Sequence, residues 1–346
     1  MKEIIIFCQA PADAQYALSI YNKYKNCSVI SIFCINVEGI YKFISSLNLN
    51  LRELVFIPYT KSISKRDPLH ILNERRRLKE MFRKHFINIT KHELYFFSHW
   101  YDWFLYGLLA KLYKNNKIYL IDHCGFTSNK FSKANNTIKL VINLLIYKFI
   151  TGVYFNVYSL DGGFPILSLP IFKYNVEKLN IPQDINKIWI KYKFNIPINQ
   201  KSILLFESAD DHDYISNYEQ TITSIIHIFH QMNIKVFIKP HPRVGFTKNL
   251  RNYAEILPSY IPGEFLPIEK FIGVFGTSST ALGILSNTYT KIYSIIDLFS
   301  YIKESDKIYF KIFLNEQSNN NITFLSQIEE IVTSDHSKKV TLIRTK

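Results

Sequence analysis

Short apolar runs alternate with longer amphipathic segments through the first 160 residues. The runs have the length and the β-branched and aromatic content of buried strands, and the segments between them have helical spacing. The predicted strands are Ile4–Cys8, Val29–Asn36, Glu53–Ile57, Leu94–Ser98 and Lys117–Ile121. The predicted helices are 11–24, Val37–Leu47, Leu69–Phe86 and His99–Lys114. This alternation predicts a parallel sheet with helices on both faces.

The longest apolar stretch of the chain is Ile138–Leu160. It contains Lys139 and Lys148, and Gly152 interrupts it among aromatic and β-branched residues. We therefore expect a buried helix followed by a strand, Gly152–Leu160, the last strand of this half, and not a membrane span.

A second α/β series begins near residue 200. It contains predicted strands at Ser202–Phe206, Lys235–Lys239, Gly273–Phe275 and Lys291–Ile296, and predicted helices at Tyr218–Met232, Ala281–Asn287 and Asn321–Val332. The proline-punctuated, polar segment 173–199 separates the two series and is the predicted linker. The domains are thus residues 1–172 and 200–320, with 321–346 a C-terminal helix or tail that could pack back on the first domain. Two Rossmann-like domains with a cleft between them form a GT-B-like α/β architecture.

The chain of 346 residues carries a net charge of +14, which favours anionic partners such as phosphates, acidic sugars or anionic lipids. A Lys-rich surface kept for solubility is the alternative. The predicted helix Leu69–Phe86 holds Arg75, Arg76, Arg77, Lys79, Arg83 and Lys84. This is either a solvated face or a basic surface for an anionic membrane or an acceptor. Because the positive charge is spread along the chain and no nucleic-acid motif is present, a nucleic-acid partner is not expected.

The four cysteines, Cys8, Cys27, Cys34 and Cys124, have no metal-binding spacing, which predicts reduced thiols in a cytosolic protein. The short apolar run after Lys2 and Glu3 is unlike a secretory signal. The expected location is the cytoplasm, and a peripheral contact with the inner face of the cytoplasmic membrane stays open.

The most informative stretch for chemistry follows the predicted strand Lys235–Lys239. Pro240, His241, Pro242 and Arg243 come directly after it. Proline fixes φ and donates no backbone hydrogen bond, so two prolines hold the histidine ring in a defined place. A histidine and an arginine at the carboxyl end of an α/β strand suit a phosphate or carboxylate ligand.

A second candidate site is the loop Gly276–Thr280, between a predicted strand and a predicted helix. The hydroxyls of Thr277, Ser278, Ser279 and Thr280 and the backbone N–H groups of a helix start favour a phosphate. The loop lacks the GK[ST] of a Walker motif. Taken alone, it could equally be an ordinary Ser/Thr helix cap.

In order along the chain, the HPR segment at His241, a PxE segment at Glu269 and the serine pair resemble bacterial sialyltransferases of the lipooligosaccharide and polysialic-acid type. The resemblance covers about residues 235–285 and extends to the first half only by pattern. It implies that His241, Ser278 and Ser279 bind the phosphate of a CMP-sugar donor. It also implies that Glu269 holds the ribose hydroxyls.

The same families place two carboxylates before a glycine at a strand end of the first domain, and one of them is the catalytic base. Here the corresponding residues are Asp122, His123, Cys124 and Gly125, so the second carboxylate is replaced and one residue is added. Asp122 and His123 are both chemically able to take a proton from an acceptor hydroxyl, and Asp122 is favoured. The alternative is a structural aspartate that caps a loop.

The resemblance implies an inverting transfer of sialic acid, or a related nonulosonic acid, from a CMP-sugar to a hydroxyl of a bacterial surface glycan such as lipooligosaccharide or capsule. No metal is expected. The acidic run Glu207–Asp213 is interpreted as a solvated loop or a lip of the nucleotide pocket, and Lys239 and Arg243 could steer the donor. Two alternatives stay open: an enzyme for another nucleotide sugar (CMP-Kdo or a UDP-sugar), and a non-catalytic basic protein that binds membranes or nucleic acid.

Overall fold

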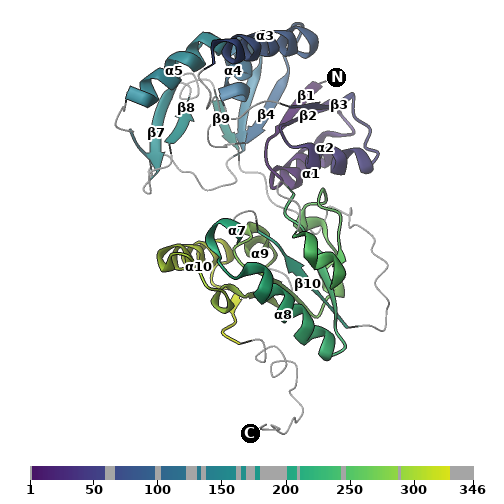
Figure 1. Ribbon diagram of the computed structural model, residues 1–346. Helices are drawn as coiled ribbons and strands as arrows, with labels where there is room; N and C mark the ends of the chain where they lie inside the picture. The colour runs from purple at the N-terminus through teal and green to yellow at the C-terminus, as the bar shows by residue number, and fades with distance from the viewer. Residues whose placement is uncertain are drawn as a thin grey trace, which may run out of the picture. The chain divides into compact units, whose positions relative to one another are not determined.

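The chain divides into two compact units, Met1–Ile188 and Trp189–Lys346, drawn from purple to teal and from green to yellow in Figure 1. The division falls inside segment 173–199. A computed structural model describes residues 2–58, 67–97, 103–121, 131–133, 138–160, 165–168, 176–179, 201–208, 211–242, 247–286 and 290–327.

Unit 1 is built on a six-stranded parallel sheet. Its strands are β1 (Lys2–Cys8), β2 (Ser28–Ile35), β3 (Glu53–Ile57), β4 (Glu93–Phe97), β5 (Lys117–Ile121) and β9 (Val176–Leu179). They lie in the order β3-β2-β1-β4-β5-β9, and every neighbouring pair is parallel. The chain thus builds outward from β1 on one side, returns, and builds outward on the other, which is the Rossmann order.

Five helices of unit 1 are α1 (Asp13–Tyr24), α2 (Glu38–Ser46), α3 (Pro68–His85), α4 (Trp103–Leu112) and α5 (Ile138–Thr151). Figure 1 shows α3, α4 and α5 on one side of the sheet and α1 and α2 on the other. The side chain of Asp67 accepts a hydrogen bond from Leu69 N and starts α3, with Pro68 in its first turn. Phe33 of β2 packs on Phe86 with ring centroids 4.9 Å apart, which fixes the end of α3 against the sheet.

The predicted last strand of this half belongs to a different sheet. β7 (Asn156–Leu160) pairs in antiparallel fashion with β6 (Phe131–Lys133) and β8 (Pro165–Ser168). Four residues separate β7 from β8, which is too short for the crossover that a parallel neighbour requires. The last strand of the parallel sheet is β9, within the predicted linker. As an edge strand with two charged residues, β9 lacks the apolar run that reveals a buried strand.

Unit 2 repeats the same sheet order. Its strands are β10 (Ser202–Phe206), β11 (Lys235–Lys239), β12 (Glu255–Ile256), β13 (Gly273–Gly276), β14 (Ile292–Ser294) and β15 (Thr323–Phe324). They lie in the order β12-β11-β10-β13-β14-β15, and all are parallel. Its helices include α7 (Asp211–Tyr214), α8 (Tyr218–Gln231), α9 (Thr280–Leu285) and α10 (Glu304–Ser318). The predicted α/β class with two Rossmann-like domains is therefore confirmed, and the cleft between them stays a prediction.

The helix predicted at Asn321–Val332 is wrong at its beginning, where β15 adds to the sheet of unit 2. The helix of this region is α10, which the sequence pattern did not predict. Its apolar residues are not confined to one face, because Ile308 and Ile312 are more than half exposed. Asn319 and Asn320, with φ of 51° and 62°, end α10 in the left-handed conformation that asparagine tolerates. Residues 328–346 lie outside the described part of the chain.

No helix in the described residues is long and apolar enough to cross a lipid bilayer. Ile138–Leu160 instead forms α5 and β7, a helix followed by a strand as the sequence predicts. The expected burial of the helix is wrong, because Val141, Leu145 and Phe149 are between 40% and 57% exposed. Trp103 of α4 stacks on Tyr147 of α5 at 5.9 Å, so this apolar segment packs within its own unit.

Gly107 allows the three helices on one side of the unit 1 sheet to approach closely. A Cβ at this position of α4 would lie 2.7 Å from Thr151 Cγ2 of α5 and 3.4 Å from Leu78 Cδ2 of α3. The first distance is well inside van der Waals contact, so no side chain fits there without movement.

Gly107→Ala is therefore expected to destabilise the protein by about 1–3 kcal/mol, although alanine is the better helix former. Thr151→Ser removes the Cγ2 that clashes and keeps the hydroxyl that donates to Tyr147 O at 2.8 Å. The double variant should regain part of the loss in the free energy of unfolding, measured with urea. If the double variant loses as much free energy of unfolding as the two single variants together, Gly107 and Thr151 do not pack as described.

Candidate functional site

Three strand ends of unit 2 lie level with one another. Phe206 of β10 is paired with Lys239 of β11 on one side and with Gly276 of β13 on the other. His241 comes two residues after Lys239, and Ser278 comes two residues after Gly276. Since neighbouring strands lie about 5 Å apart, His241 and Ser278 leave the same edge of the sheet on the order of 10 Å from each other.

This edge contains the switch point of the sheet. After β10 the chain builds β11 and β12 on one side, and then crosses to build β13 and β14 on the other. Open α/β sheets bind ligands at the carboxyl ends of the strands beside such a switch point, which here are β10 and β13. The loop that contains Thr277 and Ser278 leaves β13 at this point.

Ser208, which the sequence did not single out, joins the two strand ends. Its Oγ accepts hydrogen bonds from Thr277 Oγ1 at 3.2 Å and from Ser278 N at 3.4 Å. Ser294 Oγ at the end of β14 donates to Thr277 O at 3.0 Å. The sequence signal for Ser208 is its place two residues after the first strand of a Rossmann-like unit. It was overlooked because the neighbouring acidic residues drew the interpretation of this segment.

The serine pair lies where a cap or a ligand site would lie. Ser279 is the N-cap residue of α9, but its side chain makes no capping hydrogen bond within the described part of the chain. Ser278 and Ser279 are half-buried, and Thr280 is the first residue of the helix. The ordinary N-cap alternative therefore lacks the hydrogen bond that defines it.

The glutamate that the sequence assigned to the ribose lies elsewhere. Glu269 is exposed, on the segment that returns the chain to the amino edge of the sheet, since Ile272 N three residues later donates to Ser202 O at the start of β10. A second PxE sequence, Pro262-Gly263-Glu264, precedes it. There a Cβ on Gly263 would lie 2.4 Å from the Phe206 ring and 3.2 Å from Ala281 Cβ of α9. Glu264, and not Glu269, thus lies at the carboxyl edge beside the serine loop.

Two buried charges of opposite sign lie under this edge. Lys239 Nζ donates to Pro240 O at 2.6 Å and to Ser259 O at 3.1 Å. Burial lowers the pKa of Lys239 to about 8, although the charges of Glu264 and Glu207 act in the opposite direction. Burial likewise raises the pKa of Glu264, and Lys239 opposes that shift. Since Lys239 is only 2% exposed, its charge lies beneath the strand ends and not at the surface, and the predicted steering of a donor by this lysine stays a prediction.

Glu207 is buried, so the interpretation of Glu207–Asp213 as a solvated loop is wrong at its first residue, and a lip of the nucleotide pocket stays a prediction. Its Oε1 accepts from Thr247 Oγ1 at 2.7 Å and from Tyr218 OH at 3.5 Å, and Thr247 N also donates to the carboxylate. The carboxylate therefore connects the end of β10 to α8 and to Thr247. Among the residues that the structure describes, no group of three His, Cys, Asp or Glu side chains could hold a metal ion.

Three predicted site residues, Asp122, His123 and Arg243, lie outside the described residues. Asp122 and His123 follow β5 directly in the sequence, and Arg243 follows Pro242. Their assignments stay predictions.

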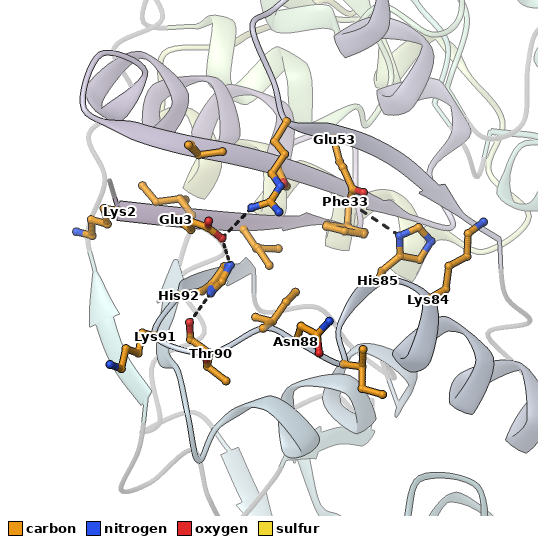
Figure 2. A pocket seen from close by; sticks show the side chains of 17 residues that line it. Lys2, Glu3, Phe33, Glu53, Lys84, His85, Asn88, Thr90, Lys91 and His92 are labelled. Atoms are coloured by element: carbon orange, nitrogen blue, oxygen red, sulfur yellow. Dashed lines mark hydrogen bonds and ion pairs between the residues drawn. The ribbon is translucent and has the colours of Figure 1, made fainter.

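Unit 1 has a cavity of about 600 Å³ at the amino edge of its own sheet (Figure 2). It is bounded by the starts of β1, β2 and β3, by the end of α3 and by residues 87–92 before β4. Glu3 forms ion pairs there with Arg52, at 2.9 Å, and with His92. Glu53 lies 3.9 Å from His85, whose pKa burial lowers. Both carboxylates in the cavity thus already have partners from the protein.

No family model and no curated protein matches the sequence. Solved structures with a similar chain path include an S. aureus MnaA–UDP co-structure, with 11% identity, a TM-score of 0.48, and coverage of 92% of this chain and 91% of that one. They also include a Neisseria meningitidis UDP-GlcNAc 2-epimerase bound to UDP-GlcNAc, with 10% identity, a TM-score of 0.46, and coverage of 97% of this chain and 98% of that one. A third is the E. coli ADP-heptose lps heptosyltransferase II, with 10% identity, a TM-score of 0.39, and coverage of 85% of this chain and 84% of that one. At these values the likenesses do not bear on the function of this chain.

Replacing Lys239 by Met should change how stability depends on pH. The pKa of about 8 in the folded protein lies below the ordinary value of 10.5, so between these values the unfolded chain binds more protons. The stability of the wild type relative to Lys239→Met should therefore rise with pH across this window, by up to about 3 kcal/mol.

Urea unfolding of both proteins at several pH values measures this difference, and other titrating groups cancel in it. Lys235→Met, which removes a lysine from the half-buried start of the same strand, is the control. If the difference in unfolding free energy between the wild type and Lys239→Met does not change with pH, the pKa of Lys239 is not lowered by burial.

Proposed function

We propose that this chain is a glycosyltransferase whose donor is CMP-sialic acid or a related CMP-nonulosonic acid, and whose acceptor is a hydroxyl of a bacterial surface glycan. The donor nucleotide binds at the carboxyl edge of the unit 2 sheet. One observation carries the proposal: the paired register of β10, β11 and β13 directs His241 and Ser278 to one edge at a switch point.

The groups at this edge suit a phosphate. Thr277 and Ser278 already hydrogen-bond to Ser208, which holds the serine loop in one conformation before any ligand arrives. The hydroxyls of Ser278 and Ser279 and the backbone N–H group of Ser279 supply donors to phosphate oxygens. His241, half-buried between two prolines, supplies an imidazole that donates a proton or a hydrogen bond.

Glu264 takes the role that the family resemblance gives to the PxE glutamate. A carboxylate accepts two hydrogen bonds at once, which matches the neighbouring 2′- and 3′-hydroxyls of a ribose. Glu264 is 8% exposed and lies at the same edge as the serine loop, whereas Glu269 is exposed on the segment toward the opposite edge. The PxE pattern itself fits both glutamates equally well.

In the proposed reaction an acceptor hydroxyl attacks the anomeric carbon of the donor from the side opposite to CMP. The bond between that carbon and the phosphate oxygen breaks, and CMP leaves with the electron pair. His241, Ser278 and Ser279 stabilise the negative charge that grows on the phosphate. The proton of the acceptor hydroxyl passes to a base in unit 1, for which Asp122 and His123 are the candidates.

Calorimetric titration of CMP, CDP and UDP tests the donor site. CMP should bind more tightly than UDP. His241→Ala should weaken CMP by about 10- to 100-fold, because it removes a hydrogen bond to a charged phosphate. His230→Ala, on the exposed side of α8, is the control and should leave affinity unchanged.

The result separates the alternatives. A preference for UDP over CMP would favour a transferase of a UDP-sugar and would overturn the choice of donor. If no nucleotide binds, the HPR and serine segments are a turn and a helix start, and the transferase proposal fails.

The two PxE glutamates form a matched pair for a second test. Glu264→Gln should weaken CMP by about tenfold or more, since the amide accepts fewer and weaker hydrogen bonds from the ribose. Glu269→Gln should stay within about twofold of the wild type. 2′,3′-Dideoxy-CMP should bind the wild type and Glu264→Gln about equally, because the lost contact is to the ribose hydroxyls.

The opposite pattern, with loss at Glu269→Gln alone, would return the role to Glu269. Because Glu264 is buried, circular dichroism and urea unfolding of both variants must show that they are folded.

A further inference from the structure

The layer formed by α3 and α5 exposes large apolar side chains. The two helices pack on each other, and α4 contacts both. Five of their large apolar residues are between 40% and 69% exposed: Leu69, Leu72, Val141, Leu145 and Phe149. Neither the proposed donor site, which lies in unit 2, nor the packing of the unit 1 core accounts for this exposure.

These residues form a common surface. Val141, Leu145 and Phe149 are four residues apart and make one row along α5. The guanidinium of Arg75 lies 4.4 Å from the centroid of the Phe149 ring. Leu78, three residues after Arg75, and Thr151, two residues after Phe149, both lie beside Gly107 of α4. Both helices therefore run in the same direction, which brings the amino-terminal half of α3, with its leucines, toward the amino-terminal half of α5.

The charge around this surface is strongly positive. The two helices contain eight Lys and Arg residues and two Glu residues. Glu74 is buried and lies 3.6 Å from Arg77, so Glu80 is the one exposed acidic residue on these two helices. Arg76, Lys79 and Arg83 are exposed. Burial and the nearby charges of Lys79 and Arg75 lower the pKa of Lys111 on α4, as expected where positive charge is concentrated.

We propose that this α3–α5 face docks the protein on an anionic lipid bilayer. The exposed apolar side chains would enter the boundary between head groups and acyl chains, and the exposed Arg and Lys side chains would contact lipid phosphates. Apolar burial and attraction to anionic lipids act together in interfacial binding. Each basic residue near such a surface contributes about fivefold to the affinity. The inference concerns unit 1 and holds whether or not the proposed donor is correct.

α10 of unit 2 offers a matched comparison, because apolar exposure occurs there without the positive charge. Ile308 and Ile312 are 53% and 54% exposed and lie one turn apart. Their helix contains Glu304, Asp306 and Glu316 beside Lys307 and Lys311. If exposed apolar residues alone caused membrane binding, this pair would matter as much as Val141 and Leu145.

The experiment is co-sedimentation of the full chain with vesicles of phosphatidylcholine and phosphatidylglycerol, and with vesicles of phosphatidylcholine alone. The wild type should bind the anionic vesicles and lose binding as salt is raised. Val141→Ser with Leu145→Ser should weaken binding about tenfold or more. Arg76→Gln with Lys79→Gln should weaken it about 25-fold at low salt. Ile308→Ser with Ile312→Ser should stay within about twofold of the wild type.

Three results would overturn the proposal: equal binding to neutral vesicles, an equal loss with the α10 pair, or unchanged binding of the α5 pair. Size-exclusion chromatography adds a fourth. If the wild type is a dimer that the α5 pair converts to a monomer while vesicle binding persists, the face binds a second copy of the chain. Circular dichroism checks that each variant is folded, and nucleotide titration, which reports on unit 2, should be the same for all of them.

Discussion

The pairing of β10 with both β11 and β13 is the constraint on which the rest of unit 2 depends. Parallel strands with a shared register end at the same level, so the residues that follow them all lie at the same edge of the sheet. His241, Ser208 and Ser278 come from segments up to 70 residues apart, as the hydrogen bond from Ser278 N to Ser208 Oγ shows. A slip of one residue in either pairing would turn each following side chain to the other face and separate these groups.

Buried polar groups beneath that edge hold it in shape. Glu207 accepts hydrogen bonds from Thr247 and Tyr218, and Lys239 donates to two backbone carbonyls. Removing one partner would leave a desolvated charge without compensation. These hydrogen bonds thus fix the strand ends from below, and shorter hydroxyl side chains lie above them. A rigid scaffold under a polar rim is the arrangement that keeps donors in place for a ligand.

The sequence predicted the central strands and most helices because these elements carry apolar runs and helical periodicity. It failed where neighbours, and not the local pattern, decide the structure. β9, β12 and β15 are short edge strands with little apolar content, and α10 exposes Ile308 and Ile312. In the candidate site the sequence singled out His241 and Ser278, which the strand register places at one edge. Two PxE sequences five residues apart could not be distinguished, because only the path of the chain places one of them at the carboxyl edge.

The strand order also has a consequence for how the chain folds during synthesis. In unit 1, β1 to β5 are complete at residue 121, but the edge of the sheet beside β5 stays open until β9 at 176–179 has been made. At a translation rate of about 5–20 residues per second, β5 has no outer partner for about 3–12 seconds. An unpaired edge of this kind is where a nascent chain pairs wrongly, and the interval lies within the reach of ribosome-associated chaperones. The short, charged β9 is thus the segment whose emergence completes the first sheet.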